Sequence, residues 1–490
     1  MHFRSKPLFS ALALASFLAT GAAQAGPIGY AAGTTGGGSA TPVTVSTLAQ
    51  AQAAVDAYSG SGGLVLKYTG SFDFSTITDA CAQHGKAAQI LEIKNKGNIS
   101  IIGADGSSAN FGIRVVGASS NIIIQNMSIA LTPGGSDSDI VSIEGNSTGA
   151  PGYVWVDHNT FYTSMVECGG AGDTEFDGMI DSKKGAHHIT LSYNYLHDHH
   201  KMSLNGYTDS DTSSRYITWH HNWIENVGSR APLQRGGLSH LYNNYFNKLV
   251  TSGANLRMGA VSLIEANYFE NSQNPVTSRD SSALGYWDLR NNNITSPNDF
   301  GTYGITWVAS DSSPSKDATD WTTTRSYPEA LGYSYKACAA ASVKTVVKSL
   351  AGAGKGLRTD DDCSLSGSSS SASSSTASAA SSASSSKSSS AASSTASSSA
   401  ASSSAASSSA ASSSTGAPTL SGSGDYPDGF GKCAALGETC SVSAGTGWVA
   451  FGRKGHWVSK YVGVGKSIAC TVAAFGSDPA GNPNKCAYQK

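Results

Sequence analysis

Seven segments of the chain share one hydrophobic pattern: an alternating apolar run, then an asparagine, then an aromatic or aliphatic residue. The asparagines recur at intervals of 22 to 35 residues, a period typical of stacked structural repeats. They are Asn126, Asn159, Asn194, Asn222, Asn244, Asn267 and Asn292. Each repeat has the alternation of a strand, and no helical period separates one repeat from the next. The pattern predicts an all-β solenoid of parallel coils.

An asparagine suits the bend of each coil, because it tolerates left-handed backbone and bonds locally through its side chain. Stacked coils would therefore place the seven amides in one ladder. The alternative is a β-sandwich that happens to be rich in asparagine. Sandwich strands usually recur every ~8–12 residues, so the wider spacing favours the solenoid.

A helix is predicted before the first repeat, over residues 46–58. Ser46 or Thr47 would cap its N-terminus. Its apolar residues at helical spacing are Leu48, Ala51, Val55 and Tyr58. A solenoid needs a cover over its first open core layer, and we expect this helix to be that cap.

The first 25 residues have the pattern of a secretory signal. Arg4 and Lys6 supply the positive start, residues 8–18 the apolar run, and residues 23–25 the small-residue cleavage pattern. The run is too short to span a bilayer, and no other stretch is long enough. We expect an exported, extracellular protein with no membrane partner.

Composition divides the rest of the chain into three parts. Residues 27–363 are long enough for a large core. Residues 366–423 are almost entirely Ser and Ala, which indicates a flexible tether. Residues 424–490 form a short, aromatic-rich module that we expect to be β-rich and stabilised by disulfides.

Charge and cysteine content narrow the function further. The net charge of −2 does not favour binding to nucleic acid. The eight cysteines of an exported chain favour disulfides over metal thiolates. Four lie before the tether and four after it, and each set of four allows three pairings.

Acidic residues gather near two of the predicted strands. Asp137 and Asp139 precede one strand, Asp177 and Asp181 precede another, and Asp157 lies inside a strand between them. Coils that stack would bring Asp139 close to Asp181. Carboxylate oxygens without cysteine suit Ca²⁺, although aspartates also populate turns without binding any ion.

Basic residues follow the acidic ones along the chain. They are Lys183, Lys184, Lys201, Arg230 and Arg235. Cations one or two coils from a carboxylate cluster indicate an anionic ligand that is bridged through a metal ion. A histidine group at His197, His199 and His200 is more typical of a polar turn than of a metal site.

These motifs resemble one family across nearly the whole of residues 27–363. The phrases SDSDIVSI, VWVDHNTF, DGMIDSKKGAHHITLSYN, HDHHKMSL, RAPLQRGG and NPVTSR occur in its order. The chain resembles the extracellular pectate lyases of polysaccharide lyase family 1. The resemblance implies a right-handed parallel β-helix that cleaves polygalacturonate, the anionic polymer of plant-wall pectin, by Ca²⁺-dependent β-elimination.

The resemblance also implies roles for the acidic residues. Asp139, Asp177 and Asp181 match the main Ca²⁺ ligands, and Asp137 matches an additional ligand of some members. Asp177 replaces a glutamate found in other members, so its shorter arm changes how that carboxylate reaches the ion. Asp157 matches a signature residue with a structural or supporting role.

For the basic residues, the resemblance makes Arg230 the catalytic base. Lys201 and Arg235 match groups that hold substrate carboxylates, and Lys183 is a further contact. A guanidinium acts as a base only after losing its proton, which neighbouring positive charges favour. We therefore expect an alkaline activity optimum.

By the same resemblance, the disulfides of the first unit are Cys81–Cys168 and Cys338–Cys363, and the enzyme is expected to be a monomer. The last module looks like a small module appended to other secreted enzymes. Its aromatics either fill a thin core or stack on sugars, as in a carbohydrate-binding module.

Two other functions remain open from the sequence. A β-helical polygalacturonase would hydrolyse the same polymer with paired carboxylic acids, and a β-helical adhesin would only bind it.

Overall fold

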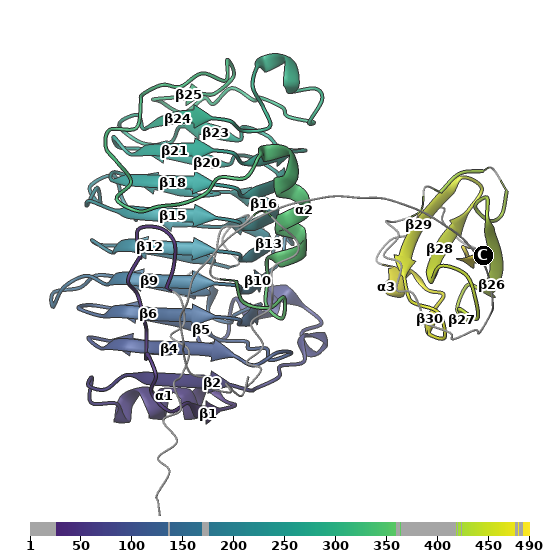
Figure 1. Ribbon diagram of the computed structural model, residues 1–490, viewed down its shortest axis with the longest axis horizontal. Coiled ribbons are helices and arrows are strands. Elements are labelled where there is room, and N and C mark those ends of the chain that lie inside the picture. Colours follow the sequence, from purple (N-terminus) through teal and green to yellow (C-terminus); the bar gives the residue numbers. More distant parts are fainter. Residues whose placement is uncertain are drawn as a thin grey trace, which may run out of the picture. The chain divides into compact units, whose positions relative to one another are not determined.

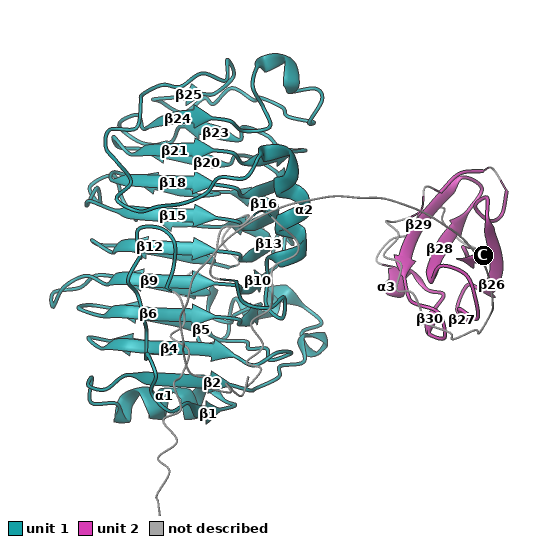
Figure 2. Ribbon diagram, in the orientation of Figure 1, with its two compact units in different colours: residues 1–377 teal, residues 378–490 magenta. Residues whose placement is uncertain are grey.

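The computed structural model describes residues 26–135, 138–168, 176–358, 363, 418, 420–422, 424–475, 479 and 484–490. The chain divides into two compact units, residues 1–377 and 378–490 (Figure 2). The predicted signal at residues 1–25 and nearly all of the predicted tether at 366–423 lie outside the described residues. No helix in the described ranges is long and apolar enough to cross a membrane.

The first unit is a stack of coils that forms three sheets (Figure 1). Sheet 1 contains β1 (Val43–Val45), β2 (Leu64–Tyr68), β4 (Gly97–Gly103), β6 (Ser120–Gln125), β9 (Gly152–Asp157), β12 (His187–Ser192), β15 (Tyr216–His220), β18 (Leu238–Tyr242), β21 (Val261–Glu265) and β24 (Tyr286–Arg290). Sheet 2 contains β3 (Ile90–Lys94), β5 (Gly112–Val116), β8 (Val141–Glu144), β11 (Ile180–Lys183), β14 (Leu204–Asn205), β17 (Leu233–Arg235), β20 (Ala254–Arg257), β23 (Val276–Ser278) and β25 (Lys316–Asp317). Sheet 3 contains β7 (Ser128–Ala130), β10 (Thr160–Tyr162), β13 (Tyr195–Lys201), β16 (Trp223–Ser229), β19 (Tyr245–Leu249) and β22 (Tyr268–Glu270).

Neighbouring strands in these sheets run parallel, except that β25 is antiparallel to β23. The inward-facing aliphatic and aromatic side chains of the three sheets fill one continuous core. The predicted parallel β-helix is confirmed, and the β-sandwich alternative is wrong.

The asparagine ladder is present, with one correction. Its amides are linked side chain to side chain at 2.9–3.2 Å and run through Asn159, Asn194, Asn222, Asn244, Asn267 and Asn292. Asn126 was also expected in it, but the ladder position of that coil is Met127, whose N–H donates to Asn159 Oδ1 at 2.8 Å. The register is one residue off because Gln125 pairs with Asp157.

The left-handed backbone expected of these asparagines is present at Asn126 but at none of the six ladder asparagines. The left-handed residue of each bend is the one before the ladder position, with φ between 50° and 57°. These residues are Asn126, His158, Tyr193, His221, Asn243, Ala266 and Asn291. The ladder asparagines are needed instead because each amide satisfies buried backbone groups of adjacent coils, as Asn222 does for Asn194 N and Leu191 O.

The predicted cap is confirmed as helix α1 (Leu48–Ala57), which lies across the β1–β2 end of the stack (Figure 1). Thr47 is its N-cap, and the Thr47 hydroxyl accepts from Gln50 N at 3.2 Å. A second helix, α2 (Ala340–Leu350), packs against β19 and β22. Short 3₁₀ turns occur at η1 (Phe74–Thr76), η2 (Ala80–Gln83) and η4 (Pro297–Asp299).

The second unit is β-rich, as expected. A four-stranded antiparallel sheet has the order β26 (Phe430–Ala435), β31 (Lys485–Gln489), β28 (Trp448–Arg453) and β29 (His456–Tyr461). A two-stranded sheet pairs β27 (Thr439–Ser441) with β30 (Ser467–Ala469), and a short helix α3 (Val472–Phe475) follows.

All eight cysteines form disulfides within their own units. The first unit contains the two pairs that the resemblance implied, Cys81–Cys168 and Cys338–Cys363. Cys433–Cys440 and Cys470–Cys486 close the second unit and resolve the pairings that the sequence left open there.

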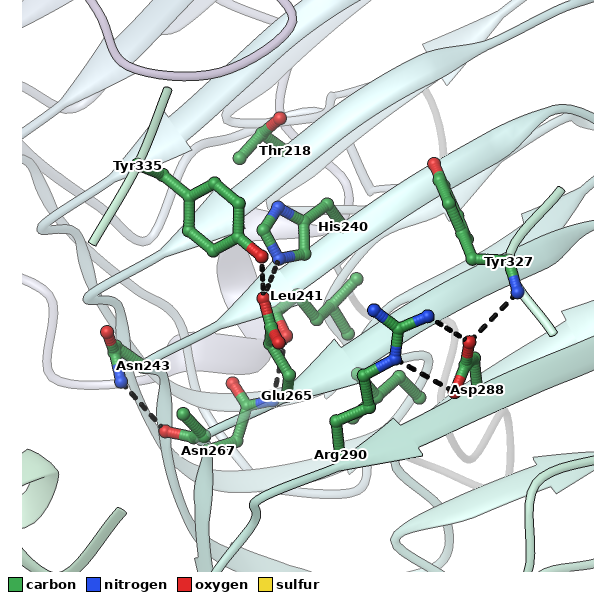
Figure 3. A network of polar contacts seen from close by, with 12 residues as sticks. Thr218, His240, Leu241, Asn243, Glu265, Asn267, Asp288, Arg290, Tyr327 and Tyr335 are labelled. Carbon is green, nitrogen blue, oxygen red and sulfur yellow. Dashed lines mark hydrogen bonds and ion pairs between the residues drawn. The ribbon is translucent and has the colours of Figure 1, made fainter. Parts of the chain in front are cut away.

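The outer face of sheet 1 carries a buried polar network under the segment that follows β25 (Figure 3). Glu265 accepts from Tyr335 and lies 3.0 Å from His240 Nε2. Asp288 accepts from Arg290 Nη2 at 2.6 Å and from Tyr327 N at 2.9 Å. The bonds of Tyr335 and Tyr327 attach the covering segment to the coils.

We expect this network to make folding sensitive to acid. Burial lowers the pKa of His240, so the folded chain keeps this ring neutral at a pH where the unfolded chain protonates it. Burial raises the pKa of Glu265, but hydrogen bonds from His240 and Tyr335 outweigh it and leave the pKa lowered. The stability due to His240 is thus lost as pH falls below about 6.5, and that due to Glu265 as pH falls further.

The measurement is the free energy of unfolding in urea at a series of pH values. His240→Gln should lessen the loss of stability between neutral and mildly acidic pH. The exposed His84→Gln is the matched control and should leave the slope unchanged. Equal slopes for wild type and His240→Gln would rule out this source of acid sensitivity.

Candidate active site

Three aspartates converge at sheet 2. Asp139 ends the loop before β8, and Asp181 lies on β11, the parallel neighbour of β8. Asp177 lies in the loop that leads into β11. One carboxylate oxygen of each lies within 4.8 Å of the others, and this is the one group of His, Cys, Asp or Glu among the described residues that could hold a metal ion.

Backbone donors orient two of these carboxylates. Asp139 Oδ1 accepts from Gly178 N at 2.9 Å, and Asp181 Oδ1 accepts from Leu204 N at 2.9 Å. Burial, followed by the charge of Asp139, raises the pKa of Asp177 and of Asp181 well above the ordinary range. A cation bound among the three carboxylates would offset the repulsion between their negative charges.

Lys183 supplies a positive charge at this place. Its Nζ lies 2.8 Å from Asp139 Oδ2, 3.0 Å from Asp181 Oδ2 and 4.0 Å from Asp177 Oδ2. Burial lowers the pKa of Lys183, but the three carboxylates outweigh it and hold the pKa above its usual value. Lys183 therefore lies among the predicted metal ligands, and the substrate contact that the resemblance implied for it stays a prediction.

Lys201 and Arg230 lie on adjacent coils. Lys201 ends β13 and is in register with Ser229, the last residue of β16. Arg230 follows Ser229 with φ 58°, and its carbonyl accepts from Ser203 N at 2.9 Å. The Arg230 charge also reaches the aspartates, because it lowers the pKa of Asp177 against the effects of burial and Asp139.

Arg235 lies at the end of β17, in register with Arg257 of β20. Arg235 Nε donates to Asp209 at 2.9 Å, and its Nη1 donates to Gly206 O at 2.7 Å. Burial, then the charges of Arg235 and Arg230, lowers the pKa of Arg257 to about 10, with Asp280 opposing.

Sequence reasoning missed Arg257. A signal was present, because Arg257 follows Arg235 by 22 residues, the same interval that separates the ladder residues Asn222 and Asn244 of those two coils.

The other candidate residues lie elsewhere. Asp137 is outside the described residues. Asp157 is fully buried on sheet 1, where its carboxylate accepts from Gln125 Nε2 at 2.7 Å and from the Ser192 hydroxyl. Burial lowers the pKa of His199 to about 3, so this ring is neutral, and it hydrogen-bonds to the backbone of Asp177 and Gly178 beside the carboxylate cluster.

A cavity of about 310 Å³ lies beside the aspartates on sheet 2. It is lined by Ile90, Ile113, Arg114, Asp139, Ser142, Glu144, Asp177 and Lys183. The site therefore combines carboxylates that could hold a divalent cation, an adjacent space, and a row of basic side chains on the next coils. Such an arrangement can bind an anionic polymer and stabilise negative charge on it.

Comparison with known proteins identifies a family. Residues 4–356 match the family model described as "Pectate lyase". Pectate lyase B of Dickeya chrysanthemi is 46% identical over 309 residues, which cover 61% of this chain and 80% of that protein.

Solved structures share the fold. Pectate lyase II from Xanthomonas campestris is 58% identical, with a TM-score of 0.64 over 67% of this chain and 99% of that one. Pectate lyase C from Erwinia chrysanthemi, solved with Ca²⁺, is 39% identical with a TM-score of 0.64 over 69% and 99% of the two chains. A mutant of pectate lyase C, in complex with pentagalacturonic acid, matches with the same identity and coverage and a TM-score of 0.63.

Proposed function

This chain belongs to the pectate lyase family and is a lyase that acts on a polysaccharide, and we propose that Arg230 and three aspartates of sheet 2 carry the reaction. The substrate class is polygalacturonate, which a relative of the same fold binds as pentagalacturonic acid. The observation that carries the proposal is the meeting of Asp139, Asp177 and Asp181 within 4.8 Å, beside the coils of Arg230 and Lys201.

Ca²⁺ is the ion that suits this site. The three nearby donors are carboxylate oxygens, which hard cations prefer, and the ammonium of Lys183 already stands among them as a cation. Ca²⁺ held by Asp139, Asp177 and Asp181 would act as a Lewis acid on the uronate carboxylate and stabilise the charge that develops there.

The other catalytic and binding roles belong to side chains of the protein itself. Arg230 takes the proton from C5 of the uronate, and the electron pair of that C–H bond forms the C4–C5 double bond. The C4–oxygen bond breaks with its electron pair on the leaving oxygen, which takes a proton from water. Lys201 and Arg235 hold substrate carboxylates and place fixed positive charge where negative charge develops. Arg257, in register with Arg235 on the next coil, adds to the positive potential of this face.

The experiment is the ultraviolet absorbance of the product from polygalacturonate, with Ca²⁺ and again with a chelator. β-Elimination gives a conjugated double bond, so absorbance should rise only with Ca²⁺. New reducing ends without absorbance would identify a hydrolase, and binding without any product would identify an adhesin.

We also propose that the protein is exported as a monomer after removal of residues 1–25. The support is the signal pattern in the sequence, together with four disulfides, which persist in oxidising compartments.

Residues 424–490 are proposed to hold the same polymer as a carbohydrate-binding module joined by the tether. The module carries seven Lys and Arg against four Asp and Glu, whereas the whole chain has a net charge of −2. A positive module complements an anionic polysaccharide. Tethering a second binding unit to the enzyme raises the effective concentration of substrate at the active site.

One face of the four-stranded sheet carries aromatic rings, of which Tyr461 is exposed and Trp457 is half-buried. Val458 of the edge strand β29 packs on the inner core, so its alternating neighbours Trp457 and Tyr461 face the other way. Tyr461 is 60% exposed and contacts Trp448 of β28 with ring centroids 5.5 Å apart. Aromatic rings of this kind can stack on sugar rings.

We expect the double variant Trp457→Ala and Tyr461→Ala to lose retention on insoluble pectate and to keep full turnover on short soluble oligogalacturonates. The matched control is Val464→Ala, which removes an exposed apolar side chain of the same unit outside these strands. Retention is measured by pull-down. Unchanged retention of the double variant would assign these rings to the packing of the module.

A further inference from the structure

The ammonium of Lys183 lies against all three carboxylates of the candidate metal site, 2.8 to 4.0 Å from one oxygen of each. Ca²⁺ lies ~2.3–2.6 Å from its oxygen ligands, so an ion bound by all three aspartates would come close to this ammonium. The two cations exclude each other by size and by charge.

The contacts of Lys183 are those of a side chain held in place. Only 15% of it is exposed, and its two short contacts are to carboxylates that are themselves 5% and 1% exposed. Charge-assisted hydrogen bonds between side chains that are this well shielded from solvent are strong. The chain itself thus offsets part of the negative charge of the carboxylate cluster before any metal binds.

Lys183 has a second position within reach. Glu144 of β8 is its register partner on the adjacent strand, and strands lie ~4.8 Å apart. The cavity of about 310 Å³ is lined by both Lys183 and Glu144, so the side chain has room to move away from the aspartates. Glu144 already accepts hydrogen bonds from Arg114 and Lys184.

We propose that Lys183 is a built-in counter-ion that fills the metal site of the free enzyme and is displaced when Ca²⁺ binds. The inference rests on the proposed metal site but goes beyond it. Metal affinity is then set by competition: each bound Ca²⁺ must break the ion pairs of Lys183. The displaced ammonium lies beside the site, where a uronate carboxylate can receive it, so substrate binding and metal binding support each other.

The test is calorimetric Ca²⁺ titration without substrate, at alkaline pH where the aspartates are ionised, together with thermal unfolding of the metal-free protein. Lys183→Gln should bind Ca²⁺ at least tenfold more tightly than wild type. Its metal-free form should unfold at a lower temperature, because three carboxylates lose their counter-ion. The rise in unfolding temperature on adding Ca²⁺ should therefore exceed that of wild type.

Lys184→Gln is the matched control. It removes the same formal charge one residue away, where the ammonium pairs with Glu144 and lies outside the aspartate cluster. Its Ca²⁺ affinity should stay within about twofold of wild type. Lys183→Arg keeps the positive charge and should bind Ca²⁺ no more tightly than wild type, so the test stands even where Lys183→Gln does not fold without metal.

The outcomes separate this inference from the proposed function. If wild-type protein binds Ca²⁺ and Lys183→Gln binds it equally or more weakly, the counter-ion role of Lys183 is ruled out and the proposed metal site stands. Tighter binding by Lys183→Arg also overturns it. Wild-type protein that binds no Ca²⁺, with product absorbance insensitive to chelator, overturns both.

Discussion

Arg230→Lys is expected to lower kcat on polygalacturonate by about 10²–10⁴-fold, the range typical of a lost general base, while the fold and Ca²⁺ binding remain. Lysine keeps the positive charge, so the attraction for the anionic polymer changes little. Lysine lacks the planar guanidine group that Arg230 extends from the left-handed bend between β16 and β17. The proton acceptor is therefore displaced from C5.

The kinetic signature distinguishes a base from a binding residue. For Arg230→Lys we expect kcat to fall far more than KM rises, since a base acts only in the transition state. Arg290→Lys is the matched control, because Arg290 lies on sheet 1 and pairs with Asp288 away from the site. An Arg230→Lys enzyme with kcat near wild type would remove Arg230 from the base role.

The surroundings of Arg230 bear on how a guanidine can accept a proton at all. Arg235 and Arg257 stand in register on neighbouring coils, and the pKa of Arg257 is lowered to about 10 by burial and then by Arg235 and Arg230. The alkaline optimum expected from the sequence stays a prediction, which the dependence of kcat on pH would test.

Repeats were the part of the fold most accessible from sequence. The asparagines recur because each buried amide must satisfy backbone groups of the coils beside it, so a physical need is repeated at every coil. The same pattern misassigned Asn126, because that coil replaces the ladder residue by Met127 and keeps an asparagine one position earlier. A one-residue shift in register cannot be recognised from side-chain type alone.

Stacking of coils indicated that Asp139 and Asp181 would lie near each other, and their carboxylates do. The two residues are not equivalent positions, because Asp181 is in register with Ser142, so the loop before β8 is what brings the Asp139 carboxylate to Asp181. The contact of Lys183 with the aspartates was not predictable, because a lysine side chain is long and flexible. It can point toward the aspartates or toward Glu144, its register partner on the adjacent strand. The pairing of Arg235 with Arg257 required the coil-by-coil register that the asparagine ladder supplies.

Gly178→Ala is expected to weaken Ca²⁺ binding by about 10–100-fold without unfolding the protein, the range typical of damage to the groups that support metal ligands. A Cβ built on Gly178 would lie 2.1 Å from Asp181 Oδ1 and 2.6 Å from Asp181 Cγ. Contacts that short force one side to move. The Asp181 side chain has little room to move, because it is 1% exposed and its Oδ1 accepts a hydrogen bond from Leu204 N. We therefore expect the new methyl group to push this carboxylate out of place.

The damage from Gly178→Ala would reach a second ligand. Gly178 N is also the donor that orients Asp139, so a shift of this backbone disturbs two of the three carboxylates at once. Calorimetric Ca²⁺ titration measures the loss, and activity should return in part at high Ca²⁺, because Arg230 and Lys201 are untouched. Gly85→Ala is the matched control, since a Cβ there meets no atom within 4 Å. Wild-type Ca²⁺ affinity in Gly178→Ala would mean that Asp181 can turn aside at no cost, and hence that it does not hold the ion.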